Sequence, residues 1–366
     1  MDFETLIPST NTIGHFAPIS VPLQMGVRRI ASEITADAYR RGFVGCFTDD
    51  NNQPEWARKI ARYRGDIFMH ETDTPMLEDQ FNIHGVVLKS GEGKRGFPLN
   101  LARQFNPICL MGNQNYGNCT ACSLTWDLLN LLNAIQIAHK GAAFSFGDPF
   151  GTAVVYACRG YSGQGMALSD AAWAVTNNGP SRRKKYCDGK YDFRDEDVDE
   201  AFGNKYGRSG PPSDLTDETK EESRVIKVGD AGSMDKEKLK DFLYNGALIH
   251  HGGTLTGSRT GDPICRLTGV GGHAQTTLSY DDTDECRDRL KLSKGEYVVF
   301  NQNTWGDYYS ISNWQEDLWG PYVPGTWPIL ASDAVRICNQ GSYGCYVYYT
   351  LEGLAPLDLD WKEIVP

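Results

Sequence analysis

The chain has 366 residues, of which 40% are hydrophobic and 11% aromatic, which is enough for a globular protein with a substantial core. Its formal net charge of −11 argues against a nucleic-acid-binding surface as the main function. There is no run of about 18 or more apolar residues, so we expect no membrane-spanning helix.

The first part of the chain, residues 1–96, consists of short segments interrupted by glycine and proline. We predict helices at about 32–41 and 54–63. The part ends in residues 90–96, a polar, basic and glycine-rich stretch that we interpret as an exposed linker and a candidate site of proteolysis. We place a boundary there, before a domain that spans residues 97–366.

A helix is predicted at residues 124–139, where apolar side chains recur every three or four positions and form one face. Cys119 precedes this run in a turn that begins at Gly117. The N-terminus of a helix favours an anion, because its backbone N–H groups are unpaired and the helix dipole is positive there. A thiol at this position becomes a nucleophilic thiolate more easily, so Cys119 is a candidate nucleophile.

Short elements of both kinds follow this helix. We predict a strand at 152–156, a glycine-rich loop at 160–165 and a helix at 170–176 with Ser169 as its N-cap. Residues 180–232 carry basic and then acidic runs, and we interpret them as a solvated insertion or mobile loop.

The C-terminal part is rich in strands. One helix is predicted at 235–244. The predicted strands are at 247–251, 275–280, 297–301, 334–337 and 345–351. Because helices come first and strands afterwards, we predict an α+β protein made of two packed subdomains.

Two polar residues near these strands complete a possible catalytic set. His273 precedes one predicted strand, and Asn303 follows another. A cysteine hydrolase needs an imidazole to activate the thiol and a third group to fix the tautomer of that imidazole. The oxygen of an asparagine side chain can accept the ring N–H, and Trp305 can shield that bond from water. The sequence therefore predicts a Cys119, His273 and Asn303 triad.

This order of residues resembles that of the papain-like cysteine peptidases. Gly-Asn-Cys-Thr-Ala at 117–121 is similar to the Gly-Ser-Cys-Thr-Ala of the family's bacterial and viral branches. Asn-Thr-Trp-Gly at 303–306 is similar to the family's Asn-Ser-Trp-Gly turn, and Phe-Pro-Leu-Asn-Leu at 97–101 to the start of its mature domain. The resemblance covers about residues 97–310 and does not explain residues 1–96 or 180–232.

The resemblance implies a papain-like fold, in which a helical subdomain with a central helix after the cysteine packs against an antiparallel β subdomain. It implies a peptide or protein substrate and no metal or organic cofactor. The candidate substrate-binding residues are Gly163, Gln164, Gly165, Gly272 and Trp305.

The family places an oxyanion-hole glutamine six residues before the cysteine, and here that position is Asn113. Gln114 stands five residues before the cysteine, and a one-residue deletion in the loop would give it the role. We favour Gln114. Losing one oxyanion donor costs roughly 10²–10³ in turnover.

Other interpretations of the cysteines and histidines carry less weight. Cys119 and Cys122 have the spacing of a redox or zinc motif, but the chain has no second such pair. His250-His251 is not expected to bind a metal, because adjacent strand residues face opposite ways. Cys338 and Cys345 flank a turn-like stretch and are candidates for pairing across a hairpin.

Three functions remain open on this basis. The first is a papain-like cysteine peptidase. The alternative is a papain-fold structural or interaction protein of a large assembly, such as a virion component, and a transferase that uses the same thiol is the third. Residues 1–96 would be an inhibitory pro-region or an assembly arm, and we favour the arm because no long helix is predicted there. The N-terminus lacks the pattern of a signal peptide, so we expect a cytoplasmic or virion-associated protein.

Overall fold

The computed structural model describes most of the chain from residue 88 onward, together with one short strand before it. The described residues are 46–47, 88–97, 114–140, 148–223, 226–231, 233–258, 263–304, 311, 313–340 and 344–350. The predicted helices at 32–41 and 54–63 lie outside these residues, as do Asn113 and Trp305.

A single continuous helical segment begins at Cys119 and ends at Lys140. It consists of α5 (Cys119–Cys122), the π-helical η5 (Ser123–Leu129) and α6 (Asn130–Lys140). The leucines of its apolar face, including Leu124, Leu128 and Leu131, are fully buried. The helix predicted from this periodicity is confirmed, and it starts five residues earlier than expected.

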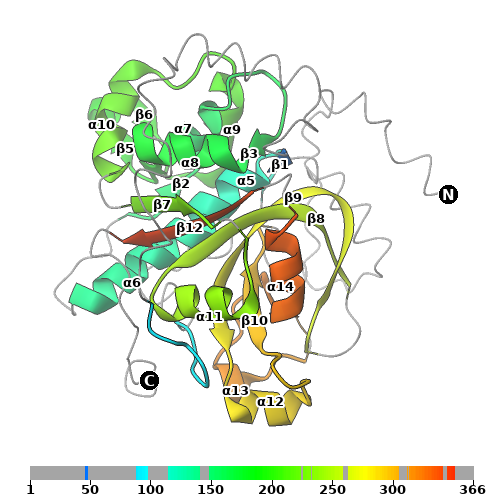
Figure 1. Cartoon of the computed structure of the whole chain (residues 1–366). Helices are drawn as coiled ribbons and strands as arrows, with labels where there is room; N and C mark the ends of the chain where they lie inside the picture. The colour runs from blue at the N-terminus through cyan, green and yellow to red at the C-terminus, as the bar shows by residue number, and fades with distance from the viewer. Residues whose placement is uncertain are drawn as a thin grey trace.

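The helices between this segment and the large sheet lie together at the top of the molecule in Figure 1. They are α7 (Ala153–Ala157), α8 (Leu168–Asn177), the 3₁₀ turn η6 (Cys187–Gly189), α9 (Glu196–Tyr206) and α10 (Ser213–Ser223). Two short antiparallel pairs accompany them, β2 (Phe150–Gly151) with β4 (Ser181–Arg182) and β5 (Lys185–Tyr186) with β6 (Tyr191–Asp192).

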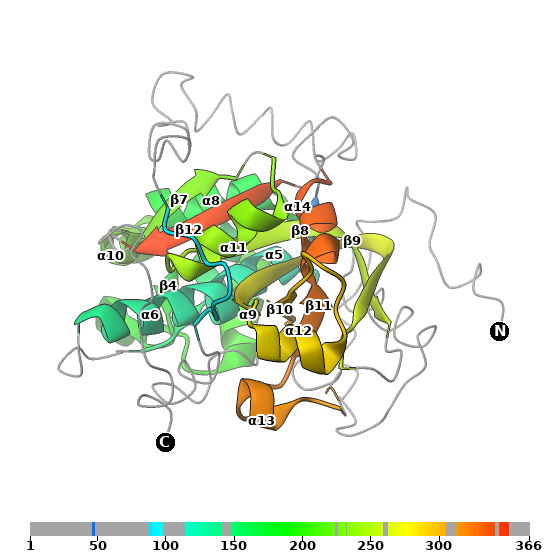
Figure 2. The same cartoon turned by 60° about the horizontal axis from the view of Figure 1, so that its bottom comes forward.

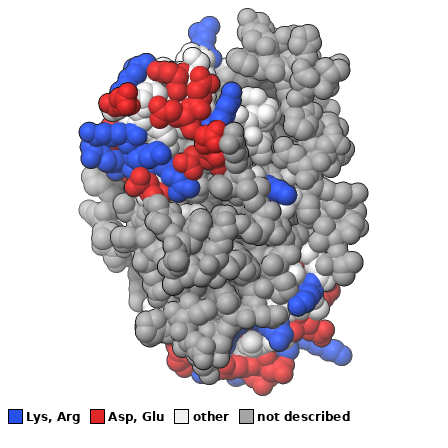
Figure 3. All heavy atoms as spheres, turned by 90° about the vertical axis from the view of Figure 1, so that its left-hand side faces the viewer, with Lys and Arg blue, Asp and Glu red and all other residues white. Residues whose placement is uncertain are grey.

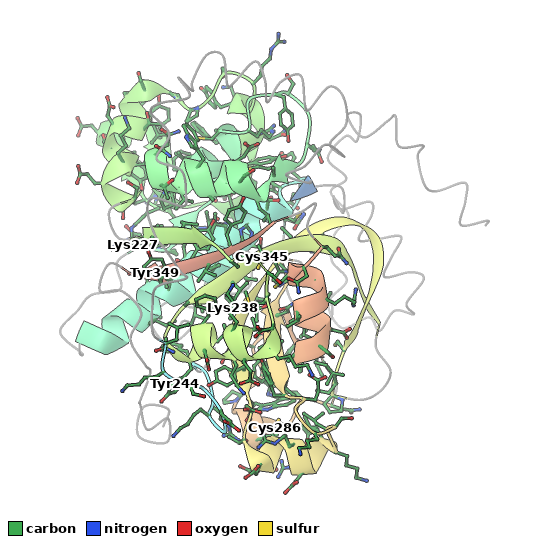
Figure 4. The ribbon with its side chains drawn as sticks, viewed as in Figure 1. Lys227, Lys238, Tyr244, Cys286, Cys345 and Tyr349 are labelled. Carbon is green, nitrogen blue, oxygen red and sulfur yellow. The ribbon has the colours of Figure 1, made fainter. Side chains whose placement is uncertain are left out.

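The second part is a six-stranded antiparallel sheet with the strand order β11-β10-β9-β8-β12-β7. Its strands are β7 (Ile226–Asp230), β8 (Leu248–Ser258), β9 (Arg266–Asp281), β10 (Val298–Gln302), β11 (Thr326–Leu330) and β12 (Cys345–Thr350). Figure 4 shows the labelled side chains of Lys227 and Tyr349, which are partners across β7 and β12.

Helices cover both faces of this sheet. Alternate residues of one strand point to opposite faces, and accordingly Tyr348 joins the core of the first helical part while Val347 and Tyr349 join a second core. That second core is formed with α11 (Lys236–Tyr244) and α14 (Ala331–Cys338). Figure 2 shows α12 (Asp284–Leu290) and α13 (Glu316–Trp319) at the end of the sheet far from α8 and α10.

The expected α+β class is confirmed, with a helical part that contains the segment after Cys119 and a part built on an antiparallel sheet. The segment between β9 and β10 forms a surface excursion between two paired strands. Most of α12 is exposed, although Cys286 is buried.

Two predicted strands are wrong, because both segments are helices. Residues 153–157 form α7, where the short run Val154-Val155 gave no periodicity that separates a strand from a helix. Residues 334–337 lie within α14. Its buried residues Ala331, Ala334 and Ile337 follow the helical spacing of three, which a longer sequence window would have included.

Most of residues 180–232 is regular structure and not a mobile loop, and its description as a solvated insertion stays a prediction. It contains α9 and α10, and the side chain of Asp195 caps α9 by accepting hydrogen bonds from the backbone N–H groups of Asp197 and Val198. The outer face of this part carries intermixed positive and negative side chains (Figure 3), which explains the polar appearance of the sequence. Its inner face buries Asp199 and Glu200.

The glycine-rich stretch at 90–96 is anchored rather than loose. The backbone N–H of Gly91 donates to the carboxylate of Asp241, and that of Gly93 to the carboxylate of Asp282. These bonds fix the turn against α11 and the end of β9. The stretch is thus fixed in place although Ser90, Glu92, Gly93 and Lys94 are exposed, and its role as a linker between domains stays a prediction.

Two further observations concern the whole described part. Cys338 and Cys345 are free thiols, one at the end of α14 and the other at the start of β12, so they do not form the suggested disulfide.

Among the residues that the structure describes, no helix is long and apolar enough to cross a membrane.

Candidate active site

Cys119 is the first residue of the central helix, and its side chain is fully buried. The preceding residue, Asn118, occupies the N-cap position without a side-chain capping bond. The sulfur accepts a hydrogen bond from the backbone N–H of Ala274 at 3.4 Å. This bond places the thiol against β9, next to the residue that follows His273.

His273 lies within β9, where it was expected just before a strand. Its Nε2 is 2.8 Å from Oδ1 of Asn303, which directly follows β10. Because an asparagine Oδ1 only accepts, Nε2 carries the proton and Nδ1 is the basic nitrogen of the neutral ring. The pairing of β9 with β10 thus brings His273 and Asn303 together, as a cysteine hydrolase would require.

The protonation states of the site are set by burial. Burial raises the pKa of the Cys119 thiol to about 12, although the hydrogen bond from Ala274 opposes this shift. Burial lowers the pKa of His273 to about 4, opposed by the bond to Asn303 and assisted by the nearby His251. Both groups are therefore neutral at pH 7 in this structure. Desolvation thus opposes the thiolate that was expected from the position of Cys119 at the helix N-terminus.

Gln114 connects the loop before Cys119 to the end of β10. Its backbone N–H donates to the carbonyl of Thr304 at 2.8 Å, and its Oε1 accepts a hydrogen bond from the Thr304 hydroxyl. Its Nε2 donates to the carbonyl of Tyr116 at 3.0 Å. The side-chain donor that an oxyanion hole would use is thus bonded within the loop in this structure.

The glycine-rich loop at 160–165 packs directly on the same turn. The Gln164 side chain accepts a hydrogen bond from the Gly117 N–H at 2.8 Å, and the Gly165 N–H donates to the Gly117 carbonyl at 2.7 Å. Gly165 has φ +97°, a conformation that favours glycine. These contacts give Gln164 and Gly165 a part in fixing the turn, in addition to the substrate-binding role expected of them and of Gly163.

A buried arginine ties the start of that loop to α9. Arg159 donates from Nε to the carbonyl of Gly163 at 2.8 Å, and from its terminal nitrogens to the carbonyls of Tyr156, Gly203 and Asn204 at 2.7–3.0 Å. Its guanidinium also stacks on the Tyr156 ring, 3.9 Å from the centroid.

Two further histidines lie buried under the site, on β8. Nε2 of His250 is 2.9 Å from the Ser123 hydroxyl, and Nε2 of His251 is 3.1 Å from the Thr277 hydroxyl and 3.4 Å from Oδ1 of Asn301. Burial lowers the pKa of His250 well below its usual range and that of His251 to about 4. In the described part of the chain, no three His, Cys, Asp or Glu residues are grouped so that they could hold a metal ion.

The structure brings together Cys119, His273, Asn303, Gln114 and the Gly163–Gly165 loop from four separate stretches of sequence. Gly272 is buried on β9 next to His273, and Trp305 lies outside the described residues. Glu200 and Arg159, which contact the loops around the site, were not predicted from the sequence. The sequence signal for Glu200 is the pair Asp199-Glu200, which lies on the buried face of α9.

No protein-family model matches the sequence, and no curated protein matches it. Among solved structures, the chain is similar to xylellain, a cysteine protease from Xylella fastidiosa, with 17% identity, a TM-score of 0.38, and coverage of 73% of this chain and 100% of that one. It is also similar to the proform of Amb a 11, a cysteine protease and ragweed pollen allergen, with 14% identity, a TM-score of 0.40, and coverage of 74% and 67%. A third is the procathepsin B from Trypanosoma congolense, with 14% identity, a TM-score of 0.37, and coverage of 74% and 80%. The first two of these neighbours are cysteine proteases by name. Because these TM-scores are below 0.5, we infer function from the geometry of this chain.

Proposed function

We propose that the chain is a papain-like cysteine peptidase that hydrolyses peptide or other amide bonds, with Cys119 as the nucleophile. One observation carries the proposal: the Cys119 sulfur lies against the backbone N–H of Ala274, directly after His273, whose Nε2 is 2.8 Å from Asn303. A thiol, an imidazole and a group that fixes its tautomer are the three parts that thiol hydrolysis needs.

The reaction needs only protein groups and water. Nδ1 of His273 takes the thiol proton as the sulfur attacks the carbonyl carbon, and returns it to the departing amine. The backbone N–H of Cys119 and Nε2 of Gln114 stabilise the oxyanion. Since Gln114 Nε2 is bonded to the Tyr116 carbonyl, its amide turns when substrate binds. Water then hydrolyses the thioester.

The position of β1 (Cys46–Phe47) bears on the role of the N-terminal segment. This strand pairs in parallel with β3 (Met166–Ala167), directly after Gly165, and Figure 1 shows it near the start of α5. It therefore lies where the backbone of a substrate would run along the Gly163–Gly165 loop. This supports a pro-region that covers the groove, rather than the assembly arm that we favoured from the sequence.

The complete burial of the site supports a second candidate function. Cys119 and His273 have no exposed surface, and Asn303 has 1%. A papain-like chain that serves as a structural or interaction module, with weak or no catalysis, has no need for an open groove.

Peptide hydrolysis by the full chain, measured before and after limited proteolysis of residues 1–96, separates the candidates. The peptidase is supported if hydrolysis appears or rises and Cys119→Ala abolishes it. No hydrolysis in either state, combined with the loss of oligomers on proteolysis, supports the module and overturns the peptidase.

A further inference from the structure

The middle of α9 faces the loop that leads into Cys119. Glu200 has no exposed surface. Its Oε1 accepts a hydrogen bond from Nδ2 of Asn118 at 3.0 Å, and its Oε2 accepts one from the backbone N–H of Asn115 at 2.9 Å. Sγ of Cys122 lies 3.6 Å from Oε1. One carboxylate thus contacts the residue before the candidate nucleophile and the residue one helical turn after it.

All three contacts present a hydrogen to Glu200, so its protonation state decides how many of them it can accept. An ionised carboxylate accepts from all three at once. A protonated one has to donate its own hydrogen, and a suitable acceptor is Oδ1 of Asn118, which is buried and makes no hydrogen bond within the described structure. That bond would require the Asn118 amide to turn over, and its Nδ2 would then lose the carboxylate.

The charge of Glu200 changes close to neutral pH. Burial raises its pKa to about 8, although the hydrogen bonds from Asn118 and Asn115 oppose the shift. Other titratable or charged groups face it from each neighbouring element. They are Glu196 on α9, which is paired with Arg183, Tyr116 in the loop and Cys122 on α5. Asp197 acts on Tyr116, and Asp199 and Cys119 act on Cys122, so these three groups lie one step further away.

We propose that Glu200 is a positioning residue, which holds the loop of the nucleophile in its reactive geometry when its carboxylate is ionised. The proposal rests on the proposed function of Cys119. Glu200 itself touches neither substrate nor reacting atoms, because its contacts are to Asn115, Asn118 and Cys122. It therefore acts on turnover and leaves substrate binding along the Gly163–Gly165 loop unchanged.

The variant Glu200→Gln tests this proposal, because an uncharged amide imitates the protonated acid at every pH. The matched control is Asp217→Asn, an exposed carboxylate on the adjacent helix α10. Each full-length protein is compared in two assays from about pH 6 to about pH 9, which span the titration of Glu200. One is the kcat and KM for peptide hydrolysis, and the other is the deuterium exchange of peptides that cover residues 114–118.

We expect Glu200→Gln and the natural protein to behave alike at acid pH and to differ at alkaline pH. The kcat of Glu200→Gln should equal that of the natural protein near pH 6 and fall about tenfold below it near pH 9, as for the loss of a hydrogen bond to a charged group. KM should not change. The amide of Asn115 should exchange faster in the variant only at the alkaline end, and the control should match the natural protein throughout.

Other outcomes are equally decisive. Unchanged exchange and unchanged kcat across the whole range would overturn the proposal, and so would a drop in kcat of the same size at every pH, which indicates only a structural defect. If the natural protein hydrolyses nothing but the exchange of Asn115 still diverges at alkaline pH, the contact is supported and the peptidase function is what fails.

Discussion

Acidification should destabilise this fold through the histidines buried under and within the site. In the part of the chain that the structure describes, His250, His251 and His273 are fully buried, and burial lowers the pKa of each. The unfolded chain takes up protons near pH 6.5, whereas the folded chain does not until a lower pH. Between these values the unfolded state binds more protons, so stability is present above about pH 6.5 and is lost as the pH falls.

His251 allows the size of this effect to be measured on a residue outside the proposed triad. Its pKa is lowered to about 4, and each unit of separation from the ordinary value changes the free energy of unfolding by about 1.4 kcal/mol. His251 should therefore account for a loss of about 3 kcal/mol between about pH 7 and pH 4. His251→Gln keeps a polar side chain next to Thr277 and Asn301 but cannot gain the charge.

Urea unfolding of both proteins at several pH values gives the comparison. At pH 7 the variant is expected to be the less stable, because it alters the buried bonds to Thr277 and Asn301. On acidification the natural protein should lose about 3 kcal/mol more than the variant. The contributions of Asp and Glu residues occur in both proteins and cancel. Equal losses of stability in the two proteins would show that His251 is not a buried neutral imidazole and would refute the prediction.

The remaining predictions concern the site and its supports. Asn303→Ala should lower kcat by about 10- to 100-fold with little change in KM, because the imidazole loses the group that fixes its tautomer; steady-state kinetics at one pH measure this. Gly117→Ala should reduce stability by about 1–3 kcal/mol in urea unfolding, because a Cβ there would lie 2.9 Å from Cβ of Gln164; normal stability would show that the turn can shift. Arg159→Lys should lower the free energy of unfolding by about 2–4 kcal/mol, since one ammonium cannot reach all four carbonyls that Arg159 contacts. A loss below about 1 kcal/mol would show that these four hydrogen bonds do not stabilise the fold. Brief alkylation should label Cys119 before any other cysteine once residues 1–96 have been removed; mass spectrometry of the peptides identifies the site.

The sequence predicted the parts of this fold that depend on a long periodic pattern. The helix after Cys119 was predictable because its apolar residues repeat over many turns, and β10 because it is a buried run rich in valine and phenylalanine. Short elements such as α7 carried too few residues to distinguish the two periods. α9 was missed because its acidic residues suggested solvent, although two of them point inward.

The members of the candidate site could be proposed from the sequence, but their protonation states could not. Cys119, His273 and Asn303 could be selected because the chemistry requires those residue types and their order resembles a known family. Their burial, and with it the neutral thiol and imidazole, depends on which segments pack over them. No local pattern around the three residues contains that information.

The two pKa shifts in the site share one cause, and this determines how the site can be activated. Burial disfavours the thiolate of Cys119 and the imidazolium of His273 alike, so the reactive ion pair is penalised twice in the closed structure. Admission of water would lower the first pKa and raise the second, and the attraction between the two charges would then add to both changes. The admission of water would therefore shift both pKa values in the direction that favours the ion pair. Since β1 lies along β3 next to the glycine-rich loop, displacement of that strand is the opening event that we expect to expose the thiol.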